Sequence, residues 1–136
     1  MTTTMTTAVV CATLLGALVF ALGANVTRHR AIRGKNGGPQ ASTDPTDRLL
    51  IAIRAHGNAT EYVPTLIVLF LLVAWQSPGW WSTTLVLSAT ASRLVHASGM
   101  LASTSLATPT ITREAAAAGT YLFGLALAVT TAVAVI

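Results

Sequence analysis

Long stretches without charged residues are the feature that most constrains what this chain can fold into. Ala8–Val26 has 19 residues and no charge, and Ala115–Ile136 is also uncharged. Leu49–Trp75 and Trp80–Ala102 are mostly apolar and contain few charged side chains. Because a helix needs about 20 mostly apolar residues to cross the hydrocarbon of a bilayer, we predict an all-α membrane protein. Its single domain, residues 1–136, would be a four-transmembrane-helix bundle.

The composition excludes the other broad classes of protein. Only 9% of the residues are charged and 53% are hydrophobic, whereas an ordinary soluble domain has roughly 25% charged residues. Intrinsic disorder requires low hydrophobicity and high net charge. The only cysteine, Cys11, cannot form a disulfide framework or a cysteine-rich metal site, and no metal site is expected.

The basic residues are concentrated in one predicted loop, residues 27–48. Five of the eight lysines and arginines lie there: Arg28, Arg30, Arg33, Lys35 and Arg48. Arg113 lies in the third connection, whereas residues 76–79 and both ends have none. Because basic loops stay in the cytoplasm, we predict that both termini lie outside it. This placement explains the net charge without a nucleic-acid partner. We expect the cytoplasmic loop to be mostly a mobile connector, with Asp44 or Thr46 capping the next helix.

Polar groups occur within the second and third predicted helices, where they are costly. Arg54, Asn58 and Glu61 are spaced i, i+4, i+7, so they lie on one stripe of a helix. Arg93 and His96 are three residues apart and share a face of the next helix. Glu61 and Arg93 would lie about 18 Å and about 13 Å from the cytoplasmic ends of their helices. We expect a net-positive pocket open to the cytoplasm, suited to a small anionic ligand because arginine binds carboxylates bidentately.

Structural roles remain open for these residues. Arg54 could extend to the lipid headgroups, and Glu61 could form only an interhelical ion pair with Arg93. Asn58 could hydrogen-bond between helices. His96 is expected to hydrogen-bond within the bundle rather than to transfer protons.

Two segments carry a resemblance to a known family. Ile53–Pro64, IRAHGNATEYVP, resembles the second-helix signature of the MAPEG family, the membrane-associated proteins in eicosanoid and glutathione metabolism. That signature is R-x-x-x-N-x-x-E followed shortly by proline. Ala91–Met100, ASRLVHASGM, resembles the family's third-helix pattern of arginine followed by histidine or tyrosine. The four-helix layout and the long first loop agree over nearly the whole chain. The chain looks most like short members of the bacterial inner membrane, which implies that location.

The resemblance implies a homotrimer that binds glutathione between neighbouring subunits toward the cytoplasm. The residues at positions that match the family's glutathione contacts are Arg54, Asn58, Glu61, Tyr62 and Arg93. His96 stands where some members have tyrosine, and Tyr62 could instead serve packing. Arg113 matches a basic residue at the start of the fourth helix, and its implied catalytic role is to favour the thiolate. Met100 stands where transferases often have a ligand-contacting tyrosine.

The implied activity is that of a glutathione S-transferase or peroxidase, with glutathione as co-substrate. A small hydrophobic electrophile would arrive through the bilayer. One alternative is a non-catalytic ligand-binding or scaffold protein of the same fold, because the tyrosine is missing and Arg113 aligns loosely. A second alternative is a small four-helix transporter that uses Glu61, although the neighbouring arginines disfavour a cationic substrate.

Overall fold

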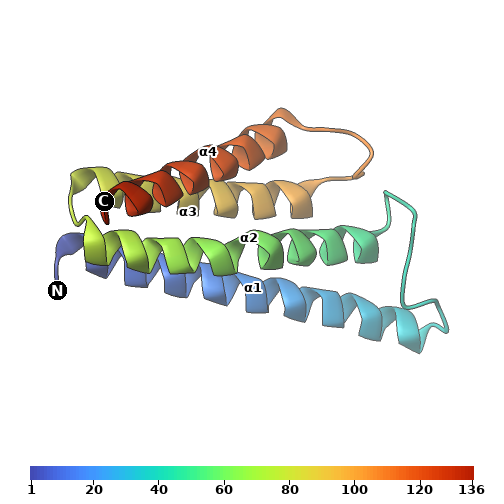
Figure 1. The fold of residues 1–136 in the computed structure, drawn as a ribbon. Helices are drawn as coiled ribbons and strands as arrows, with labels where there is room; N and C mark the ends of the chain where they lie inside the picture. The colour runs from blue at the N-terminus through green and yellow to red at the C-terminus, as the bar shows by residue number, and fades with distance from the viewer.

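The computed structural model describes residues 1–136 and is entirely helical. Its helices are α1 (Thr3–Lys35), α2 (Arg48–Gln76), α3 (Trp80–Ala102) and α4 (Ile111–Val133). α1 and α2 form one antiparallel hairpin and α3 and α4 form another, with both termini at one end of the bundle (Figure 1). The two long connections, residues 36–47 and 103–110, lie together at the other end. They contain no lysine or arginine themselves, and the basic residues predicted for the loops lie on the helix ends beside them. The predicted all-α class and its four helices are confirmed.

Three of the four helices, α1, α2 and α4, are long and apolar enough to cross a membrane. α3 has 23 residues, as many as α4. Serines and threonines, together with Arg93 and His96, are spread along it, so no stretch of α3 is as apolar as those of the other three helices. The chain is therefore a membrane protein, and the crossing of the bilayer by α3 stays a prediction.

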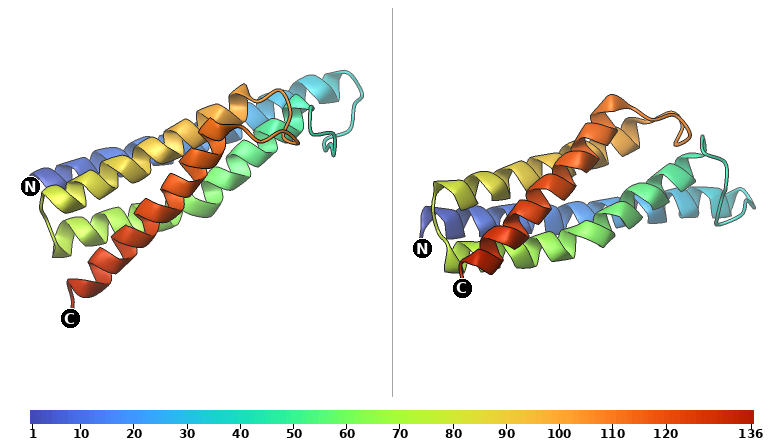
Figure 2. Two further views of the ribbon diagram at one scale, coloured as in Figure 1. Left: turned by 90° about the horizontal axis from the view of Figure 1, so that it is seen from above. Right: turned by 45° about the horizontal axis from the view of Figure 1, so that its top comes forward.

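The core lies where α1, α2 and α3 meet. Ten residues of α2 and nine of α3 are buried, but only three of α4. α4 packs mainly on α3, does not pack on α1, and crosses the other helices obliquely (Figure 2). Small buried residues such as Ala55, Ala59 and Ala89 allow the helices to approach closely. Large apolar side chains such as Phe20 and Leu122 are exposed, so they are available to lipid or to other chains.

Helix α1 continues well beyond its predicted end. The apolar run ends at Val26, but the helix runs to Lys35, and the connection to α2 covers only residues 36–47. The prediction of a loop from residue 27 is therefore wrong for its first nine residues. The end of an apolar run marks where the hydrocarbon ends, and arginine and lysine are good helix formers that can continue the helix into water.

Asp47, and neither Asp44 nor Thr46, caps the start of α2. Its side chain accepts a hydrogen bond from the Leu49 N–H at 2.8 Å, and it forms an ion pair with Arg33 at the end of α1. The Arg33 guanidinium is the main cause that holds the pKa of Asp47 at about 2, below its ordinary value of 3.8. Asp47 thus joins α1 to α2 at the end of the bundle with the long connections.

Candidate functional site

Arg93 is buried inside the bundle, with 1% of its surface exposed. Its Nη2 donates a hydrogen bond to Asn58 Oδ1 of α2 at 2.8 Å. Its Cζ lies 5.3 Å from the centre of the Tyr62 ring, within the range of a cation–π interaction. The buried Nε has no hydrogen-bond partner. Two neutral side chains of α2 therefore hold this cation, and no carboxylate of the chain does.

Glu61 does not form the ion pair with Arg93 that the sequence left open. The only ion pair in the chain lies outside the helix core, at the α1–α2 connection. Asn58 and Arg93 are each nine residues from the cytoplasmic ends predicted for their helices, a depth of about 13 Å. Glu61 is three residues further along α2 and is exposed. Asn58, rather than Glu61, therefore lies at the depth of Arg93.

Tyr62 extends this group of residues to α4. Its hydroxyl lies 3.0 Å from the Tyr121 hydroxyl, and the two rings meet edge to face with centroids 5.6 Å apart. Their mutual hydrogen bond uses one of the two hydroxyl protons, so the other is free to donate. Tyr121 is 58% exposed. Tyr121 could not be recognised from the sequence, because it is an isolated aromatic residue in an uncharged run and no spacing connects it to Tyr62.

Arg54 and Glu61 form a charged edge beside this group. Both are exposed, whereas Asn58 and Tyr62, in the neighbouring row of α2, are half-buried. None of the five main hollows of the chain is lined by Arg54, Glu61 or Arg93. One chain therefore presents Arg54, Asn58, Glu61 and Tyr62 as an open face above the buried Arg93. The pocket expected from the sequence is not enclosed within one chain. We call this the α2–α3 face.

His96 and Arg113 contact each other near the α3–α4 connection. His96 Nδ1 lies 3.1 Å from the Arg113 carbonyl oxygen, so the ring bonds within the bundle as expected. The Arg113 guanidinium donates to Ser103 Oγ at 3.2 Å and to the Leu106 carbonyl at 3.5 Å. These bonds engage part of the guanidinium with the connection, and the remaining N–H groups are free.

A set of hydrogen bonds ties the α3–α4 connection to the start of α2. Arg48 Nη1 donates to the carbonyls of Leu101 and Ser103, at 3.4 Å and 3.2 Å. The Leu106 N–H donates to the Pro45 carbonyl at 2.8 Å. Because arginine near a helix C-terminus stabilises the free carbonyls there, Arg48 closes the end of α3.

A hollow between α1 and α2 carries polar groups at one end. Arg30 and His56 line it together with apolar residues such as Val19 and Phe20. Gly23 gives the His56 ring room against α1, because a Cβ at that position would lie 3.3 Å from His56 Nε2. We call this the α1–α2 hollow. It is a second surface that carries a cation and an imidazole.

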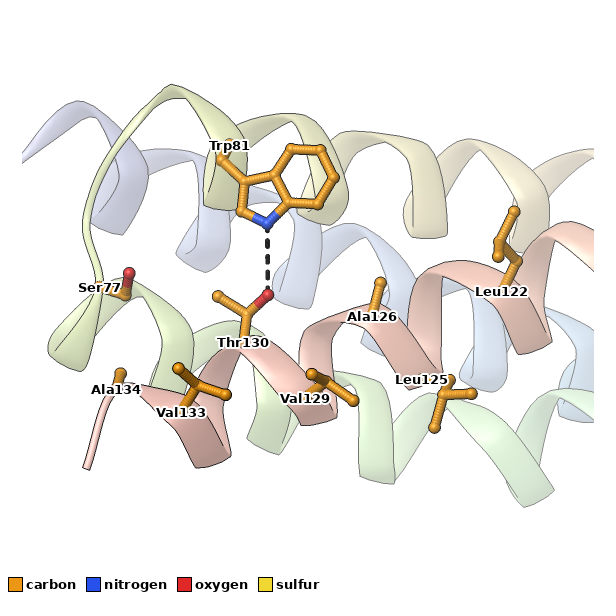
Figure 3. A pocket seen from close by; sticks show the side chains of 9 residues that line it. All are labelled: Ser77, Trp81, Leu122, Leu125, Ala126, Val129, Thr130, Val133 and Ala134. Carbon is orange, nitrogen blue, oxygen red and sulfur yellow. Dashed lines mark hydrogen bonds between the residues drawn. The ribbon is translucent and has the colours of Figure 1, made fainter. Parts of the chain in front are cut away.

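A third hollow, toward the end that holds the termini, is apolar. Trp81 Nε1 donates to Thr130 Oγ1 at 3.3 Å and so bridges α3 and α4 (Figure 3). Leu125 and Val129 line the hollow beside this bridge. None of the site residues named from the sequence lines it, so it is separate from the α2–α3 face.

The comparison with known families agrees with these features. No curated protein is significantly similar to the chain. The sequence matches the model of the MAPEG family over residues 8–133, a range that includes most of each helix and all residues of the α2–α3 face. Proteins of this family are generally associated with glutathione. The match covers far more than half of the sequence, and the chain therefore belongs to the MAPEG family.

Proposed function

We propose that the protein binds glutathione and transfers it to, or reduces with it, small apolar electrophiles. The observation that carries this proposal is the burial of Arg93 without a carboxylate partner. A buried charge without a counter-charge is unfavourable in a low-dielectric region. Glutathione has two carboxylates and one ammonium group, so its net negative charge would compensate the guanidinium.

The exposed groups of the α2–α3 face complement the remaining charges of glutathione. Arg54 would bind a carboxylate bidentately, and Glu61 would accept hydrogen bonds from the ammonium group. The Asn58 amide nitrogen is free to donate, since its oxygen already accepts from Arg93. Tyr62 would offer the unused hydroxyl proton of its pair. In this arrangement Arg93 holds Asn58 and Tyr62 in place and contributes its charge.

A second copy of the chain would supply the missing wall of the site. The α2–α3 face is open, and the α1–α2 hollow of the same chain carries Arg30 and His56. In a ring of identical chains each interface joins two different surfaces. We propose a homotrimer in which the α2–α3 face of one chain meets the α1–α2 hollow of the next.

A non-catalytic binding protein of the same fold is the second candidate. A thiol with a pKa near 8.5 needs nearby positive charge to become a thiolate at neutral pH. The Arg113 guanidinium is partly engaged by the α3–α4 connection, and His96 faces the Arg113 carbonyl. Met100 offers no hydroxyl in place of the family's tyrosine. In this alternative glutathione or a lipid-like ligand binds and does not react.

Titration of glutathione into the purified protein in lipid nanodiscs tests the proposed binding. Arg54→Ala should weaken binding by about 10- to 100-fold, because it removes hydrogen bonds to a charged group. Thr60→Ala is the matched control, since Thr60 is exposed on α2 and bonds only to the Gly57 carbonyl of its own helix. The proposal is overturned if the wild-type protein does not bind glutathione.

Conjugation of glutathione to a generic aryl halide separates the two candidates. Turnover that Arg113→Ala abolishes supports transfer. Binding without turnover, with affinity unchanged by Arg113→Ala, supports the non-catalytic protein.

We also propose that all four helices cross the bacterial inner membrane, with both termini outside the cytoplasm. Support comes from the basic residues on the helix ends beside the two long connections, which lie at one end of the bundle, and from the tendency of such basic segments to stay in the cytoplasm. Cysteines introduced at Thr2 and Ala41 provide the test, because the one native cysteine, Cys11, is buried. An impermeant maleimide should label intact spheroplasts at Thr2 and not at Ala41.

A further inference from the structure

Helix α1 is longer than a bilayer requires. Its 33 residues span about 50 Å at 1.5 Å per residue, whereas the hydrocarbon is about 30 Å thick. When the uncharged run Ala8–Val26 lies in the hydrocarbon, Thr27–Lys35 lies at headgroup level and beyond. We call Thr27–Lys35 the α1 overhang. It has four basic residues and no acidic one: Arg28, Arg30, Arg33 and Lys35.

One exposed face of α1 runs without interruption from apolar to basic residues. Its members follow one another by three or four positions, so they form a single stripe of the helix. The exposed residues of this stripe are Val10, Leu14, Ala17, Ala21, Ala24, Arg28, Ile32 and Lys35. The side of α1 that offers an apolar surface in the hydrocarbon therefore ends in two cations, Arg28 at headgroup level and Lys35 about 10 Å further along the helix.

The chain supplies no counter-charge to these two cations. Asp47 is engaged by Arg33, and the Asp44 carboxylate accepts hydrogen bonds from Thr46. Arg28 and Lys35 form no ion pair and are exposed. A partner for this stripe must therefore be anionic, and it must also accommodate an apolar side chain.

We propose that Arg28, Ile32 and Lys35 form a binding site for the headgroup of an anionic phospholipid. Arg28 contacts the phosphate directly, and the Lys35 side chain, about 10 Å further along the helix, reaches back toward it from the water. Ile32, which is 49% exposed, lies between the two cations. The acyl chains of the same lipid lie along the apolar part of the stripe. This site is separate from the proposed glutathione site, which uses neither Arg28 nor Lys35.

The test compares two lipids with identical acyl chains, phosphatidylglycerol and phosphatidylcholine, added to the full-length protein in detergent. Binding is followed by native mass spectrometry and by the unfolding temperature. The wild-type protein should prefer phosphatidylglycerol, and each cation removed should reduce that preference about fivefold. Arg28→Gln with Lys35→Gln should therefore lose it, whereas Arg28→Lys with Lys35→Arg should keep it.

Three outcomes would overturn this proposal. The first is an equal response of the wild-type protein to both lipids, and the second is a preference that persists in the double glutamine variant. The third is an equal stabilisation by inorganic phosphate, which would mean that the site takes a free anion. If the double glutamine variant does not fold, the salt dependence of the lipid preference of the wild-type protein provides the test. The preference should fall several-fold from low to high ionic strength, and a preference insensitive to salt contradicts the proposal.

Discussion

At the scale of single residues, two arginines that both lie within predicted membrane helices have different surroundings. Arg93 is buried and held by Asn58 and Tyr62, whereas Arg54 is exposed at the edge of the same face. A buried cation is coupled to the stability of the fold, because loss of its partner leaves a desolvated charge. An exposed cation is free to serve a ligand.

Asn58→Ala and Arg54→Ala should therefore differ in their effects on stability. Asn58→Ala removes the acceptor of the Arg93 guanidinium and should lower the free energy of unfolding by about 2 kcal/mol. Arg54→Ala should change it by less than about 0.5 kcal/mol. Chemical unfolding in detergent, followed by circular dichroism, provides the measurement. Equal stability of the two variants would show that Asn58 does not support Arg93.

Tyr121→Phe should weaken glutathione binding while it leaves the fold intact. The variant keeps the ring that packs on Tyr62 but removes the hydroxyl that holds the Tyr62 hydroxyl. We expect a loss in affinity of about 2- to 10-fold, as for one neutral hydrogen bond. In a double-mutant cycle, Tyr62→Phe and Tyr121→Phe should not be additive, because the hydroxyls act as a pair. Additive effects would mean that the two hydroxyls act independently.

The sequence predicts Tyr62 as a site residue, but it does not predict that Tyr121 is its partner. Tyr62 is part of the motif on α2, and helical spacing is enough to associate it with Asn58. Tyr121 is 59 residues away along the chain and meets Tyr62 only because α4 crosses the bundle obliquely. The angle at which two helices cross depends on how the whole helices pack, so it cannot be predicted from the spacing of residues within one helix.

At the scale of the helices, the apolar runs predict which segments are helical but not where the helices end. The limits predicted for the second and third helices agree with α2 and α3 to within one residue. The missed limits belong to α1, which begins at Thr3 rather than residue 8 and continues to Lys35, and to α4, which runs from Ile111 to Val133 rather than from residue 115 to residue 136. The extensions to Lys35 and to Ile111 contain charged residues, so the apolar pattern does not include them, although backbone hydrogen bonding continues the helix there.

Asp47→Asn isolates the contribution of one charge to the helix ends. Asparagine caps helices as well as aspartate does, so the substitution removes mainly the ion pair with Arg33. Because the pKa of Asp47 is about 2 in the folded chain and 3.8 ordinarily, its ionised form is favoured in the folded state. The stability gained from it is present above pH 3.8 and is lost as the pH falls toward 2.

The unfolding temperatures of the wild-type protein and Asp47→Asn should therefore differ most above pH 3.8 and converge as the pH approaches 2. Thermal unfolding at a series of pH values in a non-ionic detergent measures this difference. A difference that stays constant over the whole pH range would show that the carboxylate charge is not its source.

Arg48→Ala should loosen the tie between the two long connections. The substitution removes the hydrogen bonds to the Leu101 and Ser103 carbonyls. The neighbouring hydrogen bond from the Leu106 N–H to the Pro45 carbonyl should then open more often. Hydrogen exchange at the Leu106 amide should become faster. Lys35→Ala is the control, since Lys35 forms no ion pair, and it should leave this exchange rate unchanged. An unaltered rate in Arg48→Ala would assign the order of the connection to other contacts.

At the scale of the whole molecule, one chain carries two incomplete polar surfaces. The α2–α3 face is charged and open, and the α1–α2 hollow carries Arg30 and His56. A hydrophobic environment disfavours exposed charges such as Glu61 within a membrane-spanning segment. The two surfaces lie on different sides of α2, so neither can complete the other within one chain. The proposed association of copies would cover Glu61 and complete both surfaces, because the face of one chain would meet the hollow of the next.

Mixed assemblies test this arrangement directly. Arg54→Ala damages only the α2–α3 face, and Arg30→Ala damages only the α1–α2 hollow, so homotrimers of either variant should bind glutathione weakly. In the proposed trimer each interface would pair the face of one chain with the hollow of the next. When the two variants are mixed equally before assembly, about a quarter of the interfaces receive an intact face and an intact hollow.

Co-expression of the two variants should therefore restore about a quarter of the wild-type number of tight glutathione sites, measured by titration of the mixed protein. Mixing the two variants after each has assembled provides the control, and it should restore no tight binding as long as the chains do not exchange. Co-expressed variants that bind as weakly as the separate ones would place both arginines in the site of a single chain or outside it. Restoration requires that two chains share each site, because no single chain in the mixture has both surfaces intact.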